Sequence, residues 1–183
     1  MIGPFAFDAR CTEDQKAALK PALEETAAII GDRLTVPKGP ILLVPKAAQD
    51  MPDYDPKKPG IQPAYGLWKG YSEKRGAFIV NFWERVTEYR SRPTIQHEFM
   101  HAYDEIYLSD HPEIRKACME LMHPKPDQWF WPKGTAWGTL TYECYCVYGS
   151  AALFDILRPP YSDLLNRWVY KEDWTAFGEA LLA

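Results

Sequence analysis

The order of hydrophobic and polar positions predicts a helix near the start of the chain. Thr12 and Gln15 form a capping box, in which each side chain bonds to the backbone of the other and satisfies amides left unpaired by the first helical turn. The helical pattern continues to Ile30 and ends at Gly31, a residue type that commonly terminates helices. Pro21 lies inside this pattern, where we expect it to kink the helix.

Two short apolar runs follow the helix and predict strands. Residues 41–44 (Ile-Leu-Leu-Val) and 77–82 (Ala-Phe-Ile-Val-Asn-Phe) are rich in β-branched and aromatic side chains, which favour extended structure. Between them, residues 51–63 contain several prolines and a glycine, so we expect a loop there.

The second half of the chain has helical patterns. Pro93 suits the first position of a helix that continues through Tyr107, with Ser91 or Arg92 as its cap. The same rules predict helices over 110–122 and 139–157, a loop over 123–134, and one or two short amphipathic helices from 161 onward. Strands come early and helices late, so the predicted fold class is α+β, in a single domain over residues 1–183.

Composition narrows the range of functions. Of the 183 residues, 46% are hydrophobic and 25% are charged, and the formal net charge is −4. This balance provides no basic surface for nucleic acid or an anionic membrane, so we expect neither as a partner. Met1 to Asp8 lack the basic and apolar pattern of a signal peptide, and no apolar run approaches bilayer length. We therefore expect a cytoplasmic protein, with export by another route as the open alternative.

The four cysteines predict reduced thiols. They include no CxxC pair, and a cytoplasmic chain of this length does not need a disulfide framework. Cys144 and Cys146 are two residues apart, so on a helix they point in different directions and do not suit a shared metal ion. We expect buried thiols at Cys11, Cys118, Cys144 and Cys146.

The candidate metal ligands and the candidate general base are concentrated in the run His97-Glu98-Phe99-Met100-His101. Positions four apart on a helix lie one turn above each other, so both histidines can bind one Zn²⁺ at about 2.0–2.1 Å. Glu98 is rotated by about 100° from His97, which suits a hydrogen bond to a water on the ion rather than ligation of the ion. This is the position of a general base in an HExxH motif.

The HExxH pattern is a specific signal. Chance places it in a chain of this composition about 0.006 times. Ile95, Phe99, Ala102 and Ile106 form an apolar stripe at helical spacing, as expected for an active-site helix buried along one side. The alternative is a partly exposed helix with two incidental histidines and a solvated glutamate.

A catalytic zinc site needs a third protein ligand, for which we predict Glu143. It lies on a separate predicted helix in apolar and aromatic surroundings, where an unpaired carboxylate is costly to bury. The alternative for Glu143 is an exposed position on the polar face of that helix. Asp104 lies about 10.5 Å along the helix axis from His97, which favours a capping carboxylate or one that orients a ligand histidine. Glu120 is the reserve candidate, and His111 has the surroundings of a helix start.

With these residues in place, the chain resembles the gluzincin class of zincin metallopeptidases. The run 97–104, HEFMHAYD, is similar to the HEFGHAxD motif of the anthrax lethal factor-like peptidase domain family, which carries its ligand glutamate on a later helix. The resemblance covers these eight residues and Glu143. It implies a zincin-like fold with a small N-terminal β-sheet, an active-site helix and a mostly helical C-terminal half. Two positions depart from the family: Ala136 replaces its oxyanion-stabilising tyrosine, and Val147 replaces a frequent second acidic residue.

Two features of the predicted site have more than one interpretation. Segment 77–82 is either an edge strand that pairs with an extended peptide, as in many zincins, or a central strand of the core. The group that polarises the scissile carbonyl is also open, because aromatic packing is the alternative role for every candidate. The candidates are Tyr103, His123, Tyr142, Tyr145, Tyr148 and Tyr161.

We therefore predict a zinc-dependent endopeptidase that acts on a peptide or protein substrate. His97, His101 and Glu143 hold Zn²⁺, and Glu98 is the general base for a metal-activated water. One alternative is a zinc hydrolase of a non-peptide amide, although Cys11 lacks the Gly-Cys context of the deformylases. The other is a non-catalytic, zinc-stabilised binding or assembly module. An intact Glu98 argues against that module, because a purely structural site closes with four protein ligands.

Overall fold

The computed structural model describes residues 1–58, 63–86, 88–122, 141–155 and 171–183, leaving aside the side chains of 88–90, 141–144 and 171–174. The described residues group into two compact units, Met1–Ile106 and Tyr107–Ala183. The single domain expected over residues 1–183 stays a prediction.

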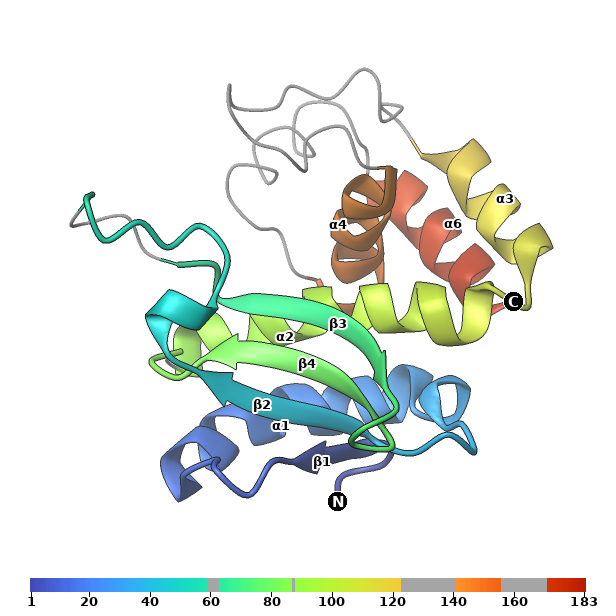
Figure 1. Cartoon of the computed structure of the whole chain (residues 1–183). Coiled ribbons are helices and arrows are strands. Elements are labelled where there is room, and N and C mark those ends of the chain that lie inside the picture. The colour runs from blue at the N-terminus through green and yellow to red at the C-terminus, as the bar shows by residue number, and fades with distance from the viewer. Residues whose placement is uncertain (59–62, 87, 123–140, 156–170) are drawn as a thin grey trace. The chain divides into compact units, whose positions relative to one another are not determined.

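The first unit contains a four-stranded mixed sheet (Figure 1). The strands β1, β2 and β4 are parallel, and β3 pairs with β4 in the antiparallel direction at the edge of the sheet. Their order across the sheet is β1-β2-β4-β3. The strands are β1 (Phe5–Phe7), β2 (Ile41–Lys46), β3 (Gly66–Ser72) and β4 (Ala77–Trp83).

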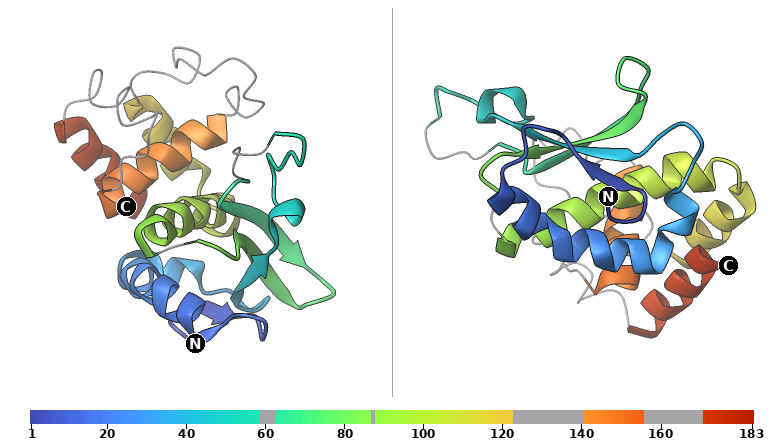
Figure 2. Two further views of the ribbon diagram at one scale, coloured as in Figure 1. Left: turned by 90° about the vertical axis from the view of Figure 1, so that its left-hand side faces the viewer. Right: turned by 90° about the horizontal axis from the view of Figure 1, so that it is seen from below.

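Two long helices, α1 (Glu13–Ile30) and α2 (Glu88–Tyr103), lie on the same face of this sheet (Figure 2). The predicted capping box is present: Gln15 N donates to Thr12 Oγ1 at 3.2 Å, and Thr12 N donates to Gln15 Oε1 at 2.9 Å. A π-helical turn, Asp104–Leu108, continues directly from α2. Short 3-10 helices occupy Asp32–Leu34 and Ala48–Asp50.

The strand β4 is central, which decides between the two interpretations of segment 77–82. All residues from Ala77 to Phe82 are buried, and β4 pairs with β2 on one side and β3 on the other. On the helix-covered side, Phe5 stacks on Phe99 of α2 with ring centroids 4.3 Å apart. The edge strands are instead β1 and β3, and the hydrophobic pattern predicted neither of them.

The predicted start of the active-site helix at Pro93 is wrong. The helix α2 begins at Glu88, so Pro93 lies inside it. Ser91 and Arg92 do not cap the helix but bind α1: Ser91 Oγ donates to Ala18 O at 3.0 Å, and the Arg92 guanidinium bonds to Glu25. These contacts stabilise the turn before Pro93 in helical form, although proline removes one backbone donor.

The second unit is helical in its described parts. It contains α3 (Pro112–Leu121), α4 (Thr141–Phe154) and α6 (Lys171–Leu182), as the helical patterns predicted for these regions. Tyr145 and Tyr148 of α4 contact Phe177 of α6, with ring centroids 5.6 and 5.2 Å apart. The predicted loop over 123–134 and the segment 161–170 lie outside the described residues.

The expected reduced thiols are present wherever the structure describes them. Cys11, Cys118 and Cys146 are buried, and none of them forms a disulfide. Burial raises the pKa of both Cys11 and Cys118 to about 11, which leaves these thiols protonated and unreactive near neutral pH. The side chain of Cys144 is outside the described part.

Strands and helices are thus combined as the α+β class predicts. Within the described ranges, no helix has both the length and the apolar character needed to cross a membrane.

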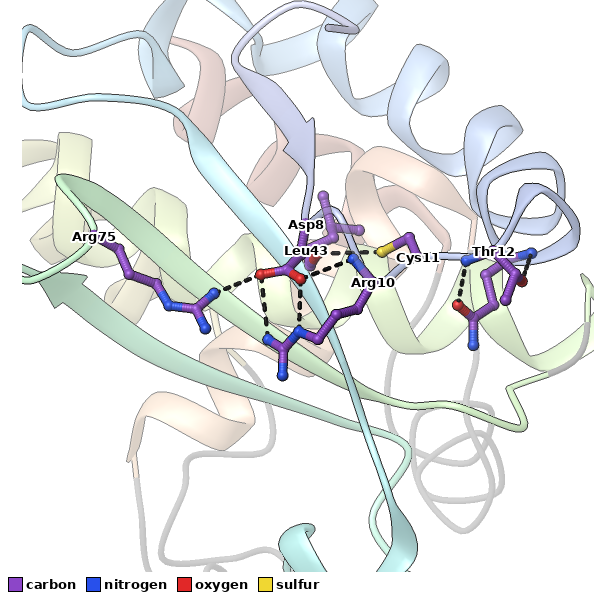
Figure 3. A network of polar contacts seen from close by, with 7 residues as sticks. Asp8, Arg10, Cys11, Thr12, Leu43 and Arg75 are labelled. Atoms are coloured by element: carbon purple, nitrogen blue, oxygen red, sulfur yellow. Dashed lines mark hydrogen bonds and ion pairs between the residues drawn. The ribbon is translucent and has the colours of Figure 1, made fainter.

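An exposed ionic cluster joins the end of β1 to the hairpin between β3 and β4. Asp8 lies between two arginines (Figure 3): Arg10 Nε donates to Asp8 Oδ1 at 2.7 Å, and Arg75 Nη1 donates to Asp8 Oδ2 at 2.6 Å. Asp8 N also donates to Leu43 O of β2 at 2.9 Å. The hydrogen bond from Arg10 is the main reason that the pKa of Asp8 is well below its ordinary value of 3.8, and Arg75 contributes to the same shift.

This cluster predicts a pH-dependent contribution to stability. Because the pKa of Asp8 is lower in the folded chain than in the unfolded chain, its contribution is present above about pH 4 and is lost as the pH falls. Asp8→Asn should therefore lower the free energy of unfolding near neutral pH, and the difference from wild type should shrink between about pH 5 and pH 2. Urea unfolding of both proteins across this range measures the effect. A difference that does not vary with pH would show that the charge of Asp8 is not responsible.

Candidate functional site

The HExxH motif lies on a stretch of α2 that is buried up to Met100, and its last residue, His101, is half-buried. Every residue from Thr94 to Met100 is buried, although Gln96, His97 and Glu98 are polar. Ile95, Phe99 and Ala102, three members of the predicted apolar stripe, are fully buried. Glu98 is therefore not the solvated glutamate of the alternative interpretation, and the assignment of the two histidines to a metal stays a prediction.

His97 and His101 face each other across one helical turn. Their ring centroids are 5.1 Å apart, and the ring planes are inclined by 82°. Two imidazoles on one tetrahedral zinc ion, each nitrogen about 2.0–2.1 Å from it, would have ring centroids about 5.2 Å apart. The spacing of the two rings therefore fits a shared zinc ion.

Glu98 is directed toward the edge strand. The residue is 7% exposed, and Oε2 accepts a hydrogen bond from the backbone amide of Trp68 at 2.7 Å. Along an antiparallel edge strand, alternate amides point away from the neighbouring strand. The Trp68 amide is one of these, so Glu98 lies beside the unpaired edge of β3.

Gly66 is needed for this close approach of β3 to α2. A Cβ atom at Gly66 would lie 2.7 Å from Thr94 Cγ2 and 2.9 Å from Glu98 Cγ. These distances are shorter than van der Waals contact, so any larger residue would displace the strand or the glutamate. The missing side chain also leaves space beside Oε1 of Glu98, which would lie 3.0 Å from such a Cβ.

A second hydrogen bond from Trp68 reaches the turn that follows α2. Trp68 Nε1 donates to Glu105 Oε2 at 2.6 Å. Sequence reasoning missed Gly66, Trp68 and Glu105, because two glycines and a lysine obscure the alternation of β3. The glycines were the available signal, since a glycine inside a strand often marks close approach of another part of the chain.

The opposite side of α2 is bound to α1 through Glu25. Gln96, which precedes the first histidine, donates from Nε2 to Glu25 Oε2 at 2.6 Å. Arg92 bonds to both oxygens of Glu25 at 2.8 and 2.9 Å, and it is the main cause of the lowered pKa of that carboxyl. The helix is therefore held by polar contacts on both sides of its histidine pair.

The side chain of Glu143, the predicted third ligand, lies outside the described part, although its backbone belongs to α4. Asp104 is half-buried and begins the π-helical turn. Glu120 is exposed and pairs with Lys116 at 3.9 Å. His111 is the N-cap residue of α3, as expected of a helix start, and stacks on Tyr107. Among the side chains described, no group of three or more histidines, cysteines or carboxylates is arranged to hold a metal ion.

The candidates for polarising a carbonyl fall into two groups. Tyr103 is fully buried and its hydroxyl accepts from Arg33 Nη1 at 2.7 Å, while Tyr145 and Tyr148 are packed among aromatic rings of the second unit. Tyr145 and Tyr148 thus contact aromatic rings, as in their alternative role, whereas Tyr103 is bonded to Arg33. The side chain of Tyr142 lies outside the described part, and so do the whole residues His123 and Tyr161.

Comparison of the chain with protein-family models, curated proteins and solved structures finds no match.

The histidine pair leads to a prediction about metal content. The purified chain should contain about one zinc ion per molecule, and His97→Ala or His101→Ala should abolish this binding, because each variant loses one of two ligands on a single helix. Elemental analysis of protein never exposed to chelator measures the stoichiometry. His111→Ala, which removes a histidine at the start of α3, is the matched control and should retain zinc. Wild-type protein without zinc would refute the assignment.

Proposed function

We propose that this chain is a zinc-dependent endopeptidase with a zincin-like fold. The observation that carries the proposal is the arrangement on α2 of two facing imidazoles with a buried glutamate beside them at the sheet edge. The ring separation of 5.1 Å supports His97 and His101 as zinc ligands. Glu143 is proposed as the third ligand, on the resemblance to the gluzincins and the need of a catalytic site for three protein ligands.

A zinc ion held by these residues would supply an activated water and a Lewis acid for the scissile carbonyl. Glu98 accepts one proton from the attacking water and transfers it to the nitrogen of the leaving amine, so that one C–O bond forms and the C–N bond breaks. Oε2 is held by the Trp68 amide. Oε1, beside the empty position at Gly66, is the oxygen placed to carry the proton.

The edge strand β3 supports a peptide as the substrate class. It has a partner strand on one side only, and its outer edge passes Glu98. An extended peptide that adds to this edge would bring its carbonyl groups past the motif, with main-chain hydrogen bonds providing affinity. This geometry favours a peptide over a small amide, and the burial of Glu98 beside two imidazoles favours a catalytic site over a structural one.

The third ligand has its own test. Glu143→Ala should weaken zinc binding severely, whereas Asp104→Ala should weaken it by no more than about 10- to 100-fold, as loss of an orienting carboxylate does. Competition with a chromogenic chelator gives both affinities. Glu120→Ala removes an exposed glutamate and serves as the control. If Asp104→Ala strips the metal and Glu143→Ala does not, the gluzincin assignment is wrong.

The catalytic role of Glu98 is tested with the variant Glu98→Gln. The amide retains an oxygen for the Trp68 N–H but cannot accept the proton, so the variant should fold, retain zinc and lose at least about 10²-fold in kcat. Mass spectrometry of a diverse peptide pool, with and without chelator, identifies cleavage, and Glu120→Gln is the control for an exposed glutamate. A wild type that cuts no peptide at any zinc loading would leave only the metal site and would favour the binding module.

A further inference from the structure

Trp68 bonds to α2 and its continuation at two places. Its backbone amide donates to Glu98 Oε2 at 2.7 Å, and its indole Nε1 donates to Glu105 Oε2 at 2.6 Å. The two carboxylates are seven residues apart, about 10.5 Å along a helix. One residue of the edge strand therefore spans the helix surface from the base to the turn beyond the second histidine.

Glycines on both sides of Trp68 make this double anchoring possible. Gly66 leaves room for Glu98, as described above. Gly70 has φ +71°, and a Cβ there would lie 3.2 Å from both oxygens of Glu105. The register of β3 against β4 also shifts between Trp68 and Gly70, which indicates a local bulge that turns this part of the strand.

The indole bond restricts the motion of an edge strand that has only one neighbouring strand. Trp68 also stacks on Phe78 of β4, with ring centroids 5.8 Å apart and planes inclined by 12°. The ring is thus fixed by β4 on one side and Glu105 on the other. With the ring fixed, the amide of the same residue stays within bonding distance of Glu98.

We propose that Trp68 is a positioning residue for the general base and that Glu105 acts through it. The Trp68 amide fixes Oε2 of Glu98 so that Oε1 is presented for proton transfer, and the indole–Glu105 bond maintains that amide in place. This inference rests on the proposed peptidase function and adds to it a contact outside the HExxH motif.

The kinetic test uses the zinc-loaded full chain and a peptide that the wild type cleaves. Trp68→Phe retains an aromatic ring on Phe78 but loses the indole donor, and Glu105→Ala loses the acceptor. Each should lower kcat by about 10-fold with little change in KM, because a misplaced catalytic group affects the chemical step. Glu105→Gln retains an acceptor oxygen and should recover most of the rate. The double variant Trp68→Phe/Glu105→Ala should be no slower than either single variant, since both remove one interaction.

Two controls separate positioning from general damage. Trp83→Phe changes a tryptophan of the neighbouring strand that contacts Tyr65, and it should retain the wild-type kcat. Zinc content and melting temperature, measured for every variant, identify any loss caused by unfolding. A readout independent of catalysis comes from ¹⁵N NMR, in which Glu105→Ala should shift the indole N–H signal of Trp68 and speed hydrogen exchange of its backbone amide.

The possible outcomes distinguish this inference from the proposed function. If the wild type cleaves peptide while Trp68→Phe and Glu105→Ala keep its kcat, the positioning role is wrong and the peptidase stands. Additive losses in the double variant, or equal losses in Glu105→Gln and Glu105→Ala, would likewise overturn it. If the wild type cleaves nothing, the proposed function fails, and the catalytic role of Trp68 fails with it.

Discussion

The burial of polar side chains along α2 is the constraint on which the first unit depends. A buried polar group without a partner costs roughly 1–3 kcal/mol, so a helix that buries glutamine, histidine and glutamate in consecutive positions requires partners on more than one side. For Gln96 and Glu98, the described contacts supply partners from two directions. Glu25 of α1 accepts from Gln96, and the Trp68 amide of β3 donates to Glu98. The positions of α1 and of the sheet edge are therefore both linked to the motif, and neither would be expected to move without changing its geometry.

This constraint explains why the edge strand has an irregular composition. A regular strand of β-branched residues would place a Cβ atom where α2 lies, because Gly66 is within contact distance of both Thr94 and Glu98. The same close approach brings an outward-pointing amide of an unpaired strand edge to the carboxylate of the motif. The glycines that allow β3 to approach the helix also lower its intrinsic preference for extended structure. The antiparallel pairing with the buried β4 offsets this loss of stability.

How much of the structure could be predicted from the sequence depends on how far apart in the chain the interacting residues lie. The capping box at Thr12 is a contact between residues three apart, and β4 is a run of β-branched and aromatic residues, so both elements were predictable from local pattern. The central position of β4 was not, because it depends on the pairing with β2 and β3. The start of α2 was not, because Ser91 and Arg92 bind Ala18 and Glu25 of α1, more than sixty positions away. The same holds for β3, whose place depends on α2 rather than on its own alternation. The spacing of the HExxH motif on a helix was enough to predict that the two imidazoles face each other. The hydrogen-bond partner of Glu98, in contrast, lies on a strand that no local pattern indicated.

The state of the Glu98 carboxylate bears on whether the motif is catalytic or only structural. A carboxylate has two oxygens and about four acceptor sites, so one oxygen can be fixed by a hydrogen bond while the other stays available. Within the described residues, Oε2 of Glu98 accepts from an amide while Oε1 accepts no hydrogen bond. Glu25, by contrast, is bonded through both oxygens to Arg92 and Gln96 and joins two helices. One oxygen fixed and one available is the arrangement that a proton-accepting group needs, because the fixed oxygen sets the direction in which the other presents its lone pairs. This difference between Glu25 of α1 and Glu98 of α2 supports the role of general base proposed for Glu98.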